Sequence, residues 1–376
     1  MSTLKVTNIE SPSGGGVNAK ITDINGGQLS NRNLIINGAM QVAQRGTSSS
    51  TITTYATVDR FRLKNVNTDQ LAGTQQQSTT APTGFSNSFK FDITTAESAI
   101  AADEYFSVRH AVEAQNLQHL EYNTSGAKAV TLSFWVRSHV TGTYSVGITN
   151  NDPNRNIAKT YSISSADTWE HKTVTFPGDT AGANPNNDNG VGFMFDWYLA
   201  AGSDYTSSDG SSWGAFAENR RAYGHTANAI GTTGGFYITG VQLEVGDVAT
   251  VFEHRSYGDE LAKCQRYFYR IGGDTVDTAL GIGAVYSATQ INVHLDLPCA
   301  MRTKPSASTT GASNWLYVAQ GASSQARNST PSIGDGGDIN LTTLRLFIES
   351  LSGLTTGYAV WCLVNANHSL DFSAEL

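Results

Sequence analysis

The residues of this chain that could do chemistry are aromatic rings set in polar loops. Tyr205 and Trp213 lie in the segment GSDYTSSDGSSWG, residues 202–214. Flat rings surrounded by hydroxyl and amide groups suit sugars, which present apolar faces and a rim of hydroxyls. We therefore predict that Tyr205 and Trp213 contact a glycan, with loop anchoring as the alternative for Trp213. Trp315 and Tyr317, which follow a Ser/Thr-rich stretch, form a second candidate pair.

The carboxylates form no catalytic motif. A glycoside hydrolase needs two carboxylates that flank the sugar, and the candidates Asp92, Glu97, Asp196 and Glu244 have no informative spacing. The eight histidines stand apart from any recognisable nucleophile. The sequence thus predicts no catalytic residue and a protein that is not an enzyme.

The elements that must position these rings are β-strands. Val130, Leu132, Phe134 and Val136 occupy alternate positions, the period of a half-buried strand, and similar runs occur at 191–197 and 291–297. Six or more such strands give two sheet faces that can pack on each other. The pattern predicts an all-β fold. Four tryptophans in strands are expected to be core residues: Trp135, Trp169, Trp197 and Trp361.

The alternation changes near residue 256, where helical spacing begins. Leu261, Cys264 and Phe268 recur at intervals of three and four. Ser256, three residues before Asp259, is typical of a helix N-cap. We therefore expect a first β-domain over 31–255, a linker helix over 256–270 and a smaller C-terminal β-sandwich over 271–376.

Three motifs in the first domain resemble a known family. They are NLIINGAMQVAQRGT (33–47), YATVDRF (55–61) and QLEVG (242–246). In this order they resemble the jelly-roll, carbohydrate-binding-module-like domain of bacteriophage tail fibre and virion appendage proteins, over roughly residues 30–270. The resemblance implies a homotrimeric structural virion protein that contacts host cell-surface glycans during adsorption. It also implies that residues 1–30 dock on phage tail or capsid proteins. Structural calcium is the one cofactor it suggests, and Asn37, Glu244 and Glu253 are the positions to inspect.

Composition excludes several other functions. The formal net charge is −8 and no basic run is present, which argues against binding to nucleic acid. The start of the chain lacks a signal-peptide core and no apolar stretch could insert into a membrane, so we expect synthesis in a cytoplasm. The resemblance implies that this is the host cytoplasm and that the protein resides in the virion. The three cysteines are unclustered and are predicted to be small buried residues. The alternatives to a glycan-binding tail fibre are a capsid fibre or decoration protein without glycan binding, and a polysaccharide-degrading enzyme.

Overall fold

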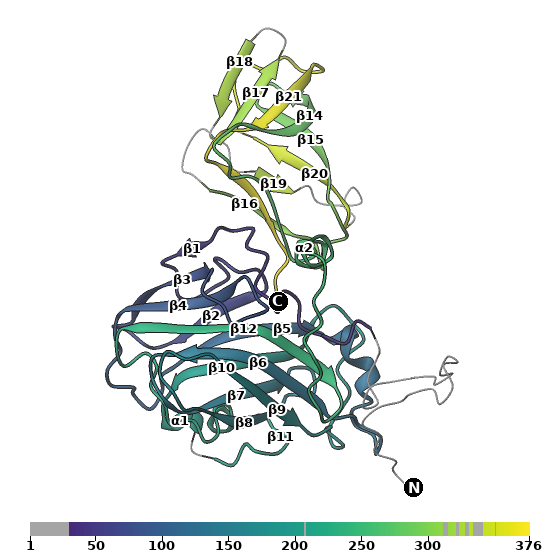
Figure 1. The fold of residues 1–376 in the computed structure, drawn as a ribbon. Coiled ribbons are helices and arrows are strands. Elements are labelled where there is room, and N and C mark those ends of the chain that lie inside the picture. Colours follow the sequence, from purple (N-terminus) through teal and green to yellow (C-terminus); the bar gives the residue numbers. More distant parts are fainter. Residues whose placement is uncertain are drawn as a thin grey trace, which may run out of the picture.

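The computed structural model describes residues 30–206, 208–310, 315–320, 323–327, 331–333, 341–349 and 351–376. The described chain forms two all-β bodies connected by one short helix (Figure 1). The predicted particle-anchoring segment, residues 1–30, lies outside the described residues except for Ser30. Among the described residues, no helix combines the length and the apolarity that a membrane span requires.

The first body contains two six-stranded antiparallel sheets. Sheet 1 has the spatial order β1 (Ser48–Ser49), β3 (Ala72–Ser78), β4 (Ser88–Thr95), β12 (Gly234–Val245), β6 (Val130–Ser138) and β9 (Glu170–Phe176). Sheet 2 has the order β11 (Gly214–Ala215), β8 (Arg155–Ile163), β7 (Gly142–Asn150), β10 (Val191–Ala201), β5 (Tyr105–Glu113) and β2 (Phe61–Val66). Three short helical segments connect these strands: η1 (Ala114–Leu120), α1 (Ser203–Thr206) and η2 (Glu218–Arg220).

The core of the first body lies between the inner faces of these sheets. Phe134 from β6 and Phe195 and Trp197 from β10 are fully buried there. The ring of Trp197 stacks on Phe195 at 5.9 Å between centroids and meets Phe134 edge-on at 6.1 Å. Burying each such ring stabilises the fold by roughly 2–3 kcal/mol. The core prediction for Trp197 is confirmed.

The second body is a smaller sandwich. Its three-stranded sheet has the order β13 (Phe268–Gly272), β22 (Ser369–Ser373) and β16 (Ser306–Thr310). Its seven-stranded sheet has the order β18 (Ser323–Arg327), β17 (Leu316–Gln320), β21 (Ala359–Val364), β14 (Thr278–Ser287), β15 (Gln290–Asp296), β20 (Thr343–Ile348) and β19 (Pro331–Ile333). A separate apolar core with Leu316, Leu346 and Phe372 holds the two sheets together.

The connecting helix is shorter than the sequence predicts. Helix α2 spans Tyr257–Gln265, and the Ser256 side chain accepts a hydrogen bond from the Asp259 backbone N–H, so the predicted cap is confirmed. Phe268 belongs to strand β13 rather than to the helix, because its backbone pairs with β22. The prediction of an all-β jelly-roll sandwich, a short helix and a smaller C-terminal β-sandwich is confirmed, with the helix ending at residue 265.

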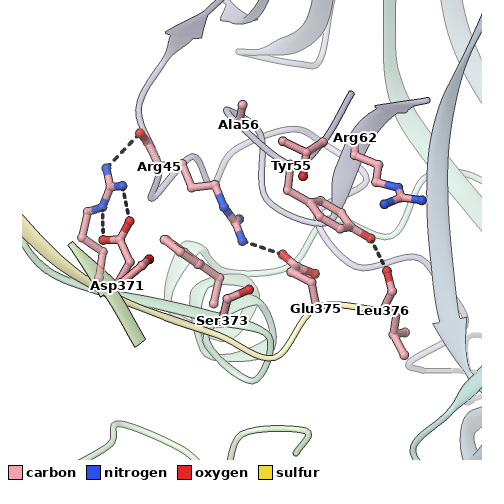
Figure 2. Close-up of a pocket in the computed structure, with 12 residues that line it drawn as sticks. Arg45, Tyr55, Ala56, Arg62, Asp371, Ser373, Glu375 and Leu376 are labelled. Carbon is pink, nitrogen blue, oxygen red and sulfur yellow. Dashed lines mark hydrogen bonds and ion pairs between the residues drawn. The ribbon is translucent and has the colours of Figure 1, made fainter. Parts of the chain in front are cut away.

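Charged side chains join the two bodies. Glu375 extends from the second body and pairs with Arg45 of the first body at 3.0 Å (Figure 2). It also pairs with Arg60 of the first body, which is fully buried. The guanidinium of Arg60 also lies 3.5 Å from the ring centre of Tyr267. Beside this cluster, Glu113 on β5 accepts hydrogen bonds from the Tyr267 hydroxyl and from Arg266. These contacts fix the orientation of the second body on the first. The QRG and DRF motifs thus serve the domain junction, since Arg45 and Arg60 belong to them.

Candidate functional site: an aromatic face on sheet 1

Tyr205 is not available to a ligand. Its side chain is buried, packs edge-on against Tyr105 at 4.7 Å and donates a hydrogen bond to the backbone carbonyl of Asp103. The reason is that the segment from α1 to residue 229 folds over the outer face of sheet 2. Its backbone bonds to strand edges, for example from Ala158 N–H to the Gly210 carbonyl. The prediction of Tyr205 as an exposed glycan contact is wrong.

Trp213 belongs to the same covering segment and anchors it. The ring is half-buried against Tyr122 and Phe193, and its indole Nε1–H donates to the Pro177 carbonyl at 2.7 Å. The indole N–H is already used in this hydrogen bond, and the ring already packs against two neighbouring rings, so Trp213 covers the edge of the sandwich. The structure therefore favours the anchoring alternative for Trp213.

The second predicted pair, Trp315 and Tyr317, does not form a common site. Trp315 is buried in the core of the second body, so it cannot meet a ligand from solvent. Tyr317 is half-buried on β17, where it is paired with Leu363 of β21. The structure does not bring the two rings to one exposed site.

A larger group of aromatic rings lies on the outer face of sheet 1, and we call it the aromatic face. Its members are Phe85, Trp135, Trp169, His171, Tyr237, Phe252 and His254, which are half-buried or exposed. The core predictions for Trp135 and Trp169 are wrong, because both rings point away from the buried face. The outer face of an antiparallel sheet that borders water is usually polar. The apolar rings of this outer face therefore contribute nothing to the core, which lies on the other side of the sheet.

One end of the aromatic face is a row across three strands. Tyr237 on β12 pairs in register with Arg137 on β6, and the ring of Trp169 lies 6.0 Å from the ring of Tyr237. The guanidinium of Arg137 and the ammonium of Lys90 lie 5.1 and 5.5 Å from the Tyr237 ring centre. Cations over the ring hold it in place and supply hydrogen-bond donors at its edge.

The other end continues the same surface. Trp135 and His171 are register partners on β6 and β9, with ring centres 5.2 Å apart. Beside Trp135 the chain passes through Gly240, whose φ of +59° suits glycine and whose missing side chain leaves room for the rings of Phe85 and Trp135. Phe85 then meets Phe252 at 5.0 Å. The rings thus form three contacting groups along this band, and Gly240 lies between the second and the third.

The charges around the band largely balance. Arg137 pairs with Asp167 at 3.3 Å and Lys172 with Glu170 at 2.6 Å. Partial burial lowers the pKa of His171 below its usual value, which favours the neutral ring near pH 7. An apolar, nearly neutral band edged by donors and acceptors suits an uncharged sugar chain better than a charged polymer.

The predicted calcium positions already have hydrogen-bond partners. The Asn37 amide bonds to the backbone of Val42 and Asp59, and the residue is fully buried in the loop before β1. Glu244 accepts hydrogen bonds from Gln242 and from Thr250.

Glu253 has a similar arrangement. Its carboxylate accepts from the backbone N–H groups of Arg32 and Asn33, and these bonds, together with the charge of Arg255, lower its pKa even though partial burial opposes the shift. The oxygen atoms that a calcium ion would need are thus used within the protein at Asn37, Glu244 and Glu253.

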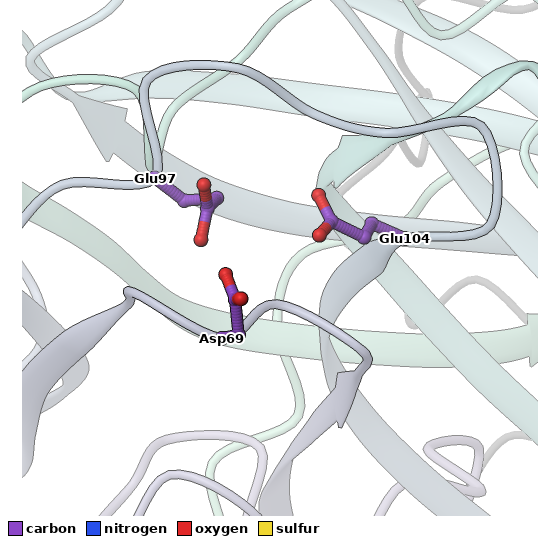
Figure 3. A group of neighbouring side chains, drawn as sticks. All are labelled: Asp69, Glu97 and Glu104. Carbon is purple, nitrogen blue, oxygen red and sulfur yellow. The ribbon is translucent and has the colours of Figure 1, made fainter.

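A different group of carboxylates could hold a cation. Asp69, Glu97 and Glu104 converge from the loops before β3 and before β5, with oxygen atoms within 4.8 Å of one another (Figure 3). Glu97 and Glu104 are buried and each accepts a backbone hydrogen bond on one oxygen, from Gln70 and Ala101, and within the described residues none of the three carboxylates forms an ion pair. Carboxylate oxygens are the ligands that calcium and magnesium prefer.

The carboxylates considered for catalysis are also held by the fold. Asp196 lies on the outer face of sheet 2, buried beneath the covering segment, and accepts a bidentate pair from Arg109 at 2.8 and 2.9 Å. Burial raises the pKa of Asp196, but Arg109, Arg221 and Ser107 together hold it below its usual value. A carboxyl that stays ionised is a poor general acid. Glu97 belongs to the cation cluster, and Asp92 pairs with Lys90 on the outer face of sheet 1.

No family model and no curated protein matches this chain. Among solved structures, the enzymatically active domain of tailspike protein 4 from bacteriophage CBA120 is similar over 57% of this chain and 21% of its own, at 12% identity and a TM-score of 0.31. The family 11 carbohydrate-binding module of the Clostridium thermocellum cellulase Lic26A-Cel5E is similar over 55% of this chain and 98% of its own, at 10% identity and a TM-score of 0.28. This chain covers about a fifth of that tailspike domain. The protein is a two-domain all-β protein whose first domain is a jelly-roll sandwich, an assignment that rests on the strand order described above.

Proposed function

We propose that this protein is a non-enzymatic glycan-binding protein that holds a sugar chain on the aromatic face of sheet 1. The observation that carries the proposal is the solvent-facing band that includes Trp135, Trp169 and Tyr237. Such rings stack on the apolar faces of pyranoses, while Arg137 and Lys90 at the rim supply hydrogen bonds to hydroxyl groups.

A matched pair of tyrosine substitutions tests the aromatic face. Tyr237→Ala removes the ring at the centre of the cationic row, and Tyr257→Ala removes an exposed ring from helix α2. On a glycan array, Tyr237→Ala should weaken the best signal roughly tenfold, the loss of about one aromatic contact, and Tyr257→Ala should leave it unchanged. Equal binding by both variants and the parent protein would refute the aromatic face as the site.

We further propose that the protein works as a homotrimeric fibre of a bacteriophage particle, attached through residues 1–30. The sequence resemblance supports the fibre role. An apolar patch on the second body supports self-association: Ile282, Tyr286, Tyr358 and Trp361 are exposed, Trp361 by 56%. Ile282 and Trp361 are register partners beside a groove of about 450 Å³. Large exposed apolar patches usually mark interaction surfaces.

Solution mass tests this part of the proposal. We expect a trimer for the full chain and for a variant that lacks residues 1–30, and a monomer for Trp361→Lys, since a charge cannot be buried at an apolar interface without a partner. A monomeric full chain would refute the fibre. In a fibre, repeated weak sites raise avidity by roughly a hundredfold or more without any new contact.

A further inference from the structure

A polar pocket of about 560 Å³ lies between the two bodies, away from the aromatic face (Figure 2). The loop before β2 and strand β2 form one wall, with Tyr55 and Arg62. Strands β13, β16 and β22 form the other, with Arg270, Ser308 and Asp371. None of its lining residues belongs to the aromatic face.

All but one of the charged groups that line the pocket are paired. Arg270 makes a bidentate pair with Asp371 at 2.8 and 2.6 Å. Arg45 pairs with Glu375, whose other oxygen is taken by the Arg60 guanidinium. Within the described residues, Arg62 makes no ion pair and no hydrogen bond, and its Nε is buried without a partner. Arg62 is therefore the one charged side chain of the lining that has no ion-pair partner among the described residues.

The nearest charged neighbours of Arg62 on the sheet are also basic residues. Its register partner across the sheet is Arg109, which is fully committed to Asp196. Lys64 follows on the same face of β2 and has no acidic partner within the described residues. Like charges opposite each other on a sheet are destabilising. An anion bound to Arg62 would offset this repulsion between positive charges. Anion binding at the pocket is therefore expected to be favourable.

We propose that this pocket binds the carboxylate of an acidic saccharide, with Arg62 as the residue that recognises it. The planar guanidinium matches a carboxylate in a bidentate pair. The ring of Tyr55, 5.5 Å from that guanidinium, and the hydroxyls of Thr54, Ser308 and Ser373 offer a face and a polar rim for a pyranose. The inference rests on the proposed function, because it takes the protein to bind glycans and assigns to it a second site, for an acidic sugar, beside the neutral chain on the aromatic face.

The test compares sugars that differ in the carboxylate. Glucuronate, N-acetylneuraminate and glucose are titrated separately into the full-length protein, and binding is followed by saturation-transfer NMR. We expect one acidic sugar to bind at least about tenfold more tightly than glucose, the contribution of one charge-assisted contact. Which of the two binds distinguishes a uronic acid from a sialic acid.

Substitutions then locate the preference. Arg62→Gln should abolish it while leaving the melting temperature unchanged or higher, because an unpaired charge is removed. Arg62→Lys should keep part of it, since the charge stays but the bidentate geometry is lost. Lys159→Gln removes a positive charge from β8 of the same sheet and should change nothing.

The two proposals fail in different ways. An acid preference that survives Arg62→Gln, or millimolar acidic sugar that does not bind at all, overturns this inference. Equal competition by inorganic sulfate also overturns it, because the pocket would then select any anion. If Tyr237→Ala removes array binding while Arg62→Gln has no effect on any sugar, the aromatic face stands and the pocket does not. The opposite pattern leaves the pocket and refutes the aromatic face.

Discussion

Replacing Glu375 with Gln should loosen the junction between the two bodies. This carboxylate is nine-tenths buried and neutralises Arg60, which is fully buried, and Arg45, which is largely buried. Gln keeps the shape of the side chain but removes the charge and directs an NH₂ group toward one of two guanidinium groups. The substitution therefore leaves at least one buried cation without its counter-ion.

The size of the effect follows from what each arginine retains. Breaking a buried ion pair by removing one partner costs about 3–5 kcal/mol. Arg60 keeps its hydrogen bond to the Ala111 carbonyl and its contact with the Tyr267 ring, and Arg45 keeps Asp59 at 3.7 Å. We therefore expect the low end of the range, a loss of about 3 kcal/mol in the free energy of unfolding.

Urea unfolding followed by tryptophan fluorescence measures this loss, because urea does not screen charges as guanidinium salts do. Glu349→Gln, at an exposed position of the second body, is the matched control and should be silent. Arg60→Met combined with Glu375→Gln should cost less than the sum of the single changes, by about 1 kcal/mol or more. A Glu375→Gln loss below about 1 kcal/mol, or full additivity in the double variant, would contradict the reasoning.

Three further predictions concern titrating groups of the first body. Burial lowers the pKa of His225 to about 4, so the neutral ring contributes stability above its usual value of 6.5, and that stability, about 3 kcal/mol, is lost as pH falls toward 4. His225→Gln should flatten this dependence in urea unfolding at a series of pH values, and an unchanged slope would contradict it. Burial raises the pKa of Asp59 to about 6, so its ionisation costs stability as pH rises from 3.8 through 6. Asp59→Asn should therefore stabilise the protein well above pH 6 and lose this advantage in acid, and a pH-independent effect would count against it. In the presence of a chelator, Asp69→Asn should relieve the repulsion with Glu97 and Glu104 and so raise the free energy of unfolding by up to about 1 kcal/mol. The melting temperature should rise accordingly. Calcium should then stabilise the parent protein more than the variant, and equal responses would show that the cluster holds no ion.

Strand periodicity predicts which face of a strand a residue occupies better than residue type does. Val130, Leu132, Phe134 and Val136 are all buried, as their alternation indicates. The same alternation places Trp135 on the opposite face, where the structure finds it. Its assignment to the core came from residue type alone.

Trp361 repeats this lesson in the second body. Val360 and Cys362 are buried, and Trp361 between them is exposed, so its core prediction is wrong. The side of a strand decides burial here more strongly than the apolarity of the side chain. Reading alternation strictly would have predicted much of the aromatic face, including Tyr237 between Phe236 and Ile238.

Other features could not be predicted from local patterns. Tyr205 is buried because the segment that contains it folds over sheet 2, and no periodicity marks that packing. Asp69, Glu97 and Glu104 come from two loops whose meeting depends on sheet order. From the sequence alone, Arg62 is an ordinary outward-facing strand residue. It lines a pocket only because strands of the second body pack opposite it. Tertiary contacts, rather than sequence spacing, create each of these sites.

The link between Arg60 and Glu375 has a consequence for biosynthesis, since 315 residues separate the two partners. The last strand of the first sandwich ends at residue 245, so this domain can emerge from the ribosome and fold while the C-terminal residues are still being translated. During that interval Arg60 lacks its partner carboxylate, Glu375, and the ring of Tyr267. A chain that stops before residue 375 would keep this defect for as long as it exists. The junction of the first domain therefore becomes charge-balanced only after the last residues of the chain have been added.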